Sequence, residues 1–68
     1  MTKKDYVSTS RMISELLQSY SDDHLPPQAY NASVDAVSNC ALRMARIFAD
    51  DNPRFDRARF LAACGVEE

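Results

Sequence analysis

Glycine is almost absent from this sequence, and the shortage restricts the fold. The chain has 68 residues, of which one is glycine, three are proline and none is tryptophan. Hairpin turns between β-strands and phosphate-binding loops depend on glycine, because glycine adopts positive φ at little steric cost. The composition therefore disfavours β-rich folds and nucleotide-binding loops.

Residues that bind metals or act as nucleophiles are also scarce. The chain has two cysteines, Cys40 and Cys64, and one histidine, His24. A structural zinc site needs about four N or S ligands at characteristic spacings, so we expect no metal site and no cofactor. We interpret both cysteines as small buried apolar side chains and His24 as a solvated loop residue. A Cys40–Cys64 disulfide is the alternative if the chain is secreted.

Long apolar runs and strong net charge are missing as well. No run approaches the 18 apolar residues of a membrane-spanning helix, and the start, MTKKDYVSTS, lacks the apolar segment of a secretory signal. We therefore expect a cytoplasmic protein that does not enter a membrane. The net charge is −2 and the pI is about 5.2, which argues against a dedicated nucleic-acid-binding domain.

Helical periodicity dominates what is present. Apolar residues recur at helical spacing in three stretches, interrupted by the proline-containing segments SDDHLPP and DDNP. The pattern predicts a single all-α domain, residues 1–68, with helices at about 3–20, 27–50 and 56–64. The expected architecture is a small three-helix bundle with a long central helix. So small a core leaves apolar surface to cover, so we also expect a homodimer.

The first helix should begin at Thr2. Thr2 and Asp5 have the spacing of a capping box, and Met1 and Tyr6 have that of a hydrophobic staple. The residues expected on or beside its apolar stripe are Tyr6, Val7, Met12, Ile13, Leu16, Leu17 and Tyr20.

The second helix carries an apolar seam with spacings of three and four residues. The seam consists of Tyr30, Val34, Val37, Ala41, Met44 and Phe48, and we expect Cys40 and Ile47 to widen it.

The third helix has start and stop signals in its own sequence. Asp56 is a suitable N-cap, Phe55 and Phe60 form a second staple pair, and Gly65 follows the last turn. Its expected core residues are Phe60, Leu61 and Cys64.

Arginines are concentrated in residues 43–59, where five of them accompany three aspartates. One interpretation is a patch that binds phosphate or the carboxylates of a partner, and the other is a solvated face with weak local ion pairs. The candidate partner-binding residues are Arg43, Arg46, Arg54, Arg57 and Arg59, with Tyr20 and Tyr30 near the first break.

A helix-turn-helix regulator is the alternative function. The break between the second and third helices has roughly the right length for that motif. The third helix, however, has mostly apolar residues, and only Arg57 and Arg59 are placed to reach DNA.

The C-terminal stretch NPRFDRARFLAACG and the start MTKKDY resemble a group of small proteins encoded by bacteriophages, prophages and plasmids. Members often end in Asn-Pro-Arg-Phe-Asp-Arg-x-Arg-Phe-Leu-x-Ala-Cys-Gly, and the resemblance covers about 20 of the 68 residues. The group has no established activity. The resemblance implies a mobile genetic element in a bacterial host, where small acidic proteins often bind a host protein, for example to inhibit a defence nuclease. We therefore expect a non-enzymatic protein-interaction module.

Overall fold

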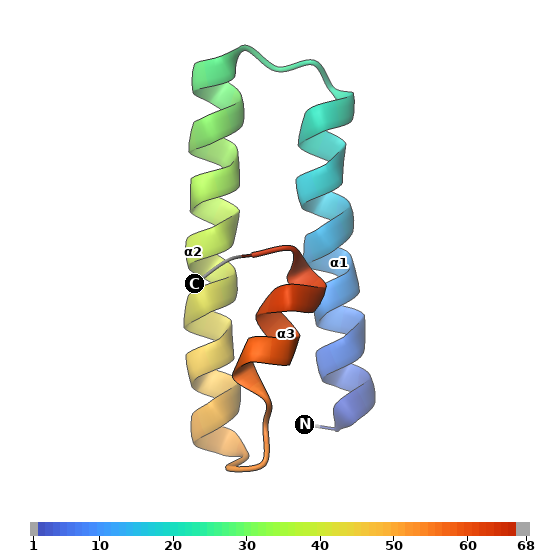
Figure 1. Cartoon of the computed structure of the whole chain (residues 1–68), viewed down its shortest axis with the longest axis vertical. Coiled ribbons are helices and arrows are strands. Elements are labelled where there is room, and N and C mark those ends of the chain that lie inside the picture. The colour runs from blue at the N-terminus through green and yellow to red at the C-terminus, as the bar shows by residue number, and fades with distance from the viewer. Residues whose placement is uncertain (1, 67–68) are drawn as a thin grey trace.

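Three helices and no strand make up residues 2–66, the part of the chain that a computed structural model describes. They are α1 (Lys3–Asp22), α2 (Pro27–Asp51) and α3 (Arg57–Cys64). The prediction of an all-α fold with a long central helix is confirmed, and each helix end lies within two residues of its predicted position. α1 and α2 form an antiparallel hairpin, and α3 lies against the half of the hairpin that contains the N-terminus (Figure 1).

The capping box at the start of α1 forms as predicted. The backbone N–H of Thr2 donates to Oδ2 of Asp5 over 2.9 Å, and the backbone N–H of Asp5 donates to Oγ1 of Thr2 over 3.4 Å. Hydrogen bonds from the Thr2 backbone and then from its side chain lower the pKa of the Asp5 carboxyl. Met1, the predicted staple partner of Tyr6, lies outside the described residues.

A tight turn redirects the chain from α2 into α3. The Asn52 carbonyl accepts from the Phe55 N–H over 2.9 Å, and Oδ1 of Asn52 accepts from the Arg54 N–H over 3.0 Å. Asparagine followed by proline is a common start for such a turn, because the asparagine side chain hydrogen-bonds its own backbone and proline presets φ. Asp56 then caps α3 by accepting from the Arg59 N–H over 3.0 Å, as predicted.

The end of α3 is a Schellman motif. Gly65 has φ of 85°, its N–H donates to the Ala62 carbonyl, and the Val66 N–H donates to the Leu61 carbonyl. Leu61 and Val66 are both buried, which supplies the apolar contact that usually accompanies this motif. The predicted role of Gly65 is confirmed.

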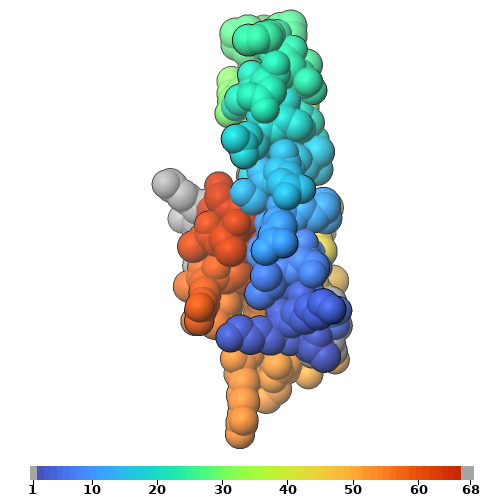
Figure 2. Space-filling model, turned by 90° about the vertical axis from the view of Figure 1, so that its right-hand side faces the viewer, coloured from blue at the N-terminus to red at the C-terminus, as the bar shows by residue number. Residues whose placement is uncertain are grey.

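The core occupies only one half of the hairpin. None of residues 14–40 is fully buried, whereas α3 covers the other half. Figure 2 shows the free half of α1 extending beyond α3. The buried apolar residues are Ile13, Ala41, Ala45, Phe48, Phe60, Leu61, Cys64 and Val66.

Several predicted core positions are wrong. Cys40 is exposed, and Ile47 on the same helix is 63% exposed, because Ala45 and Leu42 turn toward the core in their place. On α1, Leu16 is also exposed, and buried Ser10 takes an inward position. The other predicted α1 side chains that prove exposed are Val7 and Met12. The apolar stripes predicted for α1 and α2 are wider than the surfaces that become buried where the three helices pack together.

Candidate functional site

Four aromatic rings form one cluster at the end of the molecule where α3 packs. Tyr6 of α1 lies 5.0 Å from Phe48 of α2 and 4.7 Å from Phe55, measured between ring centroids. Phe60 of α3 lies 5.4 Å from Phe48 and 5.5 Å from Phe55, which confirms the predicted Phe55–Phe60 staple. The tilted and edge-on arrangements are favourable for aromatic pairs, so the cluster ties all three helices together.

A cavity opens beside this cluster, between α1 and α3. Its volume is about 330 Å³, near the lower end of the range for ligand-binding sites. The residues that line it are Lys3, Tyr6, Val7, Ser10, Asn52, Arg54, Phe55, Asp56, Arg59, Phe60 and Ala63.

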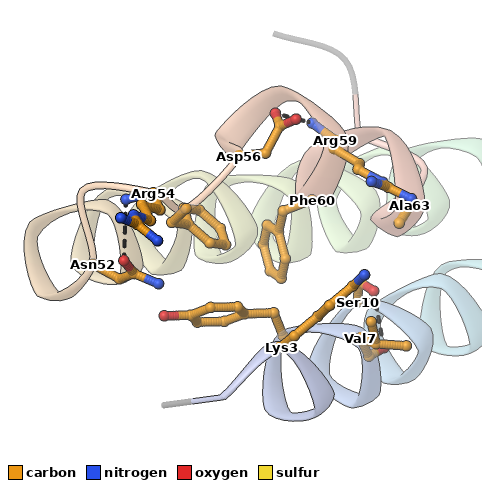
Figure 3. A pocket seen from close by; sticks show the side chains of 11 residues that line it. Lys3, Val7, Ser10, Asn52, Arg54, Asp56, Arg59, Phe60 and Ala63 are labelled. Carbon is orange, nitrogen blue, oxygen red and sulfur yellow. Dashed lines mark hydrogen bonds between the residues drawn. The ribbon is translucent and has the colours of Figure 1, made fainter.

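Three cationic side chains accompany the aromatic wall. Lys3 and Arg59 extend from α1 and α3 toward the same end of the cavity, near Ser10 and Ala63 (Figure 3). Arg54 lies at the other end, beside Asn52. An anion in the cavity would therefore meet positive charge from two sides. Apolar atoms would contact the rings.

The other polar groups of the cavity differ in their hydrogen bonding. The Asp56 carboxylate accepts from the Arg59 N–H, and Oδ1 of Asn52 accepts from the Arg54 N–H, so both already stabilise the local backbone. The Tyr6 hydroxyl is buried and has no hydrogen-bond partner among the described residues. A buried hydroxyl without a partner is costly, so Tyr6 contributes its ring rather than its hydroxyl to the favourable contacts of the cluster.

The structure divides the predicted partner-binding residues among several places. Arg54 and Arg59 both line the cavity. Tyr20 and Tyr30 are half-buried near the α1–α2 connection, at the opposite end of a molecule that is 40 Å long (Figure 1). The remaining predicted residues are exposed outside the cavity, and they are Arg43, Arg46 and Arg57.

Lys3 and Tyr6 belong to the cavity but were absent from the predicted site. The sequence places Tyr6 at the staple position of α1, which signals packing, and Lys3 is an ordinary first-turn residue. Only the packing of α3 against α1 brings Lys3 near Arg59, so no local pattern reveals the pair.

Charge is strongly segregated along the molecule. All eight Lys and Arg residues lie in residues 3–11 or 43–59, at the end where α3 packs, together with four aspartates, so these two segments have a net charge of +4. Residues 12–42, which include the free half of the hairpin, contain four acidic residues and no Lys or Arg. The helix hairpin thus has a basic end, which holds the cavity, and an acidic end.

Other kinds of site find less support in the described part of the chain. No three His, Cys, Asp or Glu side chains in residues 2–66 are placed to hold a metal ion together. Cys64 is buried, and this burial raises the pKa of its thiol. His24 is exposed. Within the same residues, none of the helices is apolar enough over a sufficient length to span a membrane.

Comparison with known proteins returns no relative for this chain: no protein-family model, no curated protein and no solved structure matches it.

Proposed function

We propose that this chain is a non-enzymatic protein-interaction module that binds an acidic segment of another protein in the cavity between α1 and α3. The observation that carries the proposal is the combination of an aromatic wall with Lys3, Arg54 and Arg59. Carboxylates pair with lysine and arginine, and aromatic rings with arginine anchor many protein interfaces. The best-fitting ligand is a peptide in which an Asp or Glu adjoins an apolar side chain.

The resemblance of the two chain ends to phage, prophage and plasmid proteins supplies the proposed context. In that context the bound protein is a host or self-encoded protein in the bacterial cytoplasm, and binding inhibits it, as in anti-defence proteins. The working unit is a homodimer, since Met12, Leu16 and Ile47 leave apolar surface without cover.

A charge-reversal series tests the cavity. Purified protein would capture partners from a bacterial lysate, and the partner identified by mass spectrometry would then be titrated in purified form by calorimetry. We expect Lys3→Glu and Arg59→Glu each to weaken binding about tenfold or more, because each places a carboxylate against the acidic ligand.

Lys4→Glu is the matched control. Lys4 is exposed, adjoins Lys3 and does not line the cavity, so its reversal changes net charge equally. We expect Lys4→Glu to weaken binding much less than Lys3→Glu. If the two reversals weakened binding equally, the ligand would be attracted by the whole basic surface rather than bound in the cavity, which would contradict the proposal.

A DNA-binding regulator is the second candidate, and the basic end of the molecule favours it. Against it, the eight-residue α3 turns Phe60, Leu61 and Cys64 into the core, which leaves little of the helix to enter a groove. A mobility-shift titration with duplex DNA separates the candidates, because DNA affinity falls steeply with salt. Binding at low salt that disappears steeply with added salt would favour the regulator, and no shift would exclude it.

A further inference from the structure

Three of the four large hydrophobic side chains that are exposed lie away from α3. On α1, Val7 lines the cavity with α3, and Leu16 is turned about 180° from Val7 at 100° per residue. Met12 lies one turn before Leu16 and is 52% exposed. On α2, Ile47 is turned about 160° from buried Ala45.

These residues define one face of the hairpin, which we call the rear face. Ile47 and Cys40 are seven residues apart on one stripe of α2, and Ala36 lies one turn before Cys40 on the same stripe. All three are exposed, and α1 contributes Met12 and Leu16 beside them. The rear face therefore runs along both helices and is apolar, with small residues that permit close approach.

We propose that a second copy of this chain packs on the rear face in antiparallel orientation. This deepens the homodimer of the proposed function, on which it rests. The separation of charge along the hairpin favours a second copy of the chain on this face and sets its orientation. In antiparallel packing the acidic half of each copy lies beside the basic half of the other, whereas parallel packing places like charges together. A two-fold interface requires such self-complementarity.

The register follows from the middle of α2. Residue 39 is the midpoint of Pro27–Asp51, and Cys40 follows it on the rear face. Two α2 helices that cross antiparallel at their midpoints therefore bring the Cys40 residues of the two copies close together at the centre of the interface.

A charge placed on the rear face tests the interface. Sedimentation equilibrium would give the dimer dissociation constant, and circular dichroism would verify that each variant folds. We expect Ile47→Asp to raise the constant about tenfold or more, because it places two carboxylates in an apolar interface. Arg46→Asp is the control. Arg46 is exposed and turned about 100° from Ile47, off the rear face, so we expect a smaller effect. Equal effects of the two substitutions would contradict packing on the rear face.

The native cysteines provide a second test. In the proposed register Cys40 lies opposite residue 38 of the other copy, so the two Cys40 residues are offset by about 3 Å along the helices. With helix axes about 8–10 Å apart, a short bismaleimide should join them. Cys64 is buried and should not react, and Cys40→Ser should abolish the cross-link.

The outcomes are separable. A monomer at millimolar concentration overturns the dimer, and a dimer in which the Cys40 residues do not cross-link overturns the antiparallel register. Ile47 does not line the cavity, so loss of dimerisation leaves partner binding by Lys3 and Arg59 to be judged on its own.

Discussion

Two residues among those described adopt positive φ, and they differ in how well they suit it. Gly65 has φ of 85° at the end of α3, and His24 has φ of 54° after the end of α1. Glycine adopts this conformation at no steric cost, whereas a side chain there costs about 1 kcal/mol or more. The same backbone conformation is therefore relaxed at one helix end and strained at the other.

Removing the glycine at position 65 and introducing one at position 24 should change the free energy of unfolding in opposite directions. Gly65→Ala should lower the free energy of unfolding by about 1 kcal/mol through backbone strain alone, since a Cβ at position 65 would meet no atom within 4 Å. His24→Gly should raise it by about 0.5 kcal/mol, because relief of strain exceeds the added freedom of the unfolded chain. Urea denaturation measures both, and a stabilising Gly65→Ala would contradict the assignment.

Cys64 makes the stability of the fold sensitive to alkaline pH. Its thiol pKa is raised by burial from an ordinary value of 9.0, so the folded state favours the neutral thiol. The unfolded thiol loses its proton first as pH rises, which means that stability is full below about pH 9 and falls above it. We expect denaturation at pH 8 and pH 10 to show a smaller pH-dependent loss in Cys64→Ala than in wild type. Cys40→Ala, at the exposed cysteine, should keep the wild-type slope.

At the scale of elements, α3 depends on its flanking residues. It has eight residues, which is too short for a stable helix in isolation. The Asp56 cap, the Phe55–Phe60 contact and the Schellman motif at Gly65 hold its two ends. Because α3 forms one wall of the cavity, these contacts also position Arg59.

Removal of the Asp56 cap should destabilise the protein measurably. Asp56→Ala leaves the Arg59 N–H without its acceptor and should cost about 1 kcal/mol, whereas Asp56→Ser should retain most of the stability. Urea denaturation of the three proteins gives the comparison. Equal losses for alanine and serine would show that the carboxylate acts through charge rather than through the cap.

At the scale of the whole molecule, stability should be unevenly distributed. The fully buried residues lie outside residues 14–40, so the free half of the hairpin has little to hold it closed. A segment opens more readily where few apolar side chains are buried, because opening there exposes less apolar surface to water.

Hydrogen exchange should reveal this gradient. At concentrations that keep the chain monomeric, we expect backbone amides in residues 14–22 and 27–38 to exchange faster than those in residues 6–13 and 41–51. Mass spectrometry or NMR resolves these segments. Uniform protection along both helices would contradict the picture of a half-covered hairpin, and added protection at high concentration would accompany the proposed dimer.

The sequence alone determines the helices, because their signals are local. The capping box at Thr2, the prolines after α1 and α2, the cap at Asp56 and the stop at Gly65 each act within a few residues. The same signals identify Phe60, Leu61 and Cys64 as core. Periodicity was less reliable for α2, where Cys40 and Ile47 fit the apolar pattern and yet are exposed.

Which side of each helix is covered, and how much of it, depends on how the three helices pack. The short α3 reaches one half of the hairpin, so an apolar seam that continues through α2 becomes core at Phe48 and only half-buried surface at Tyr30. Packing of α3 on α1 also placed Lys3 and Arg59 around one cavity, far from Tyr20. Such relations depend on contacts between residues far apart in the chain, which local preference does not encode.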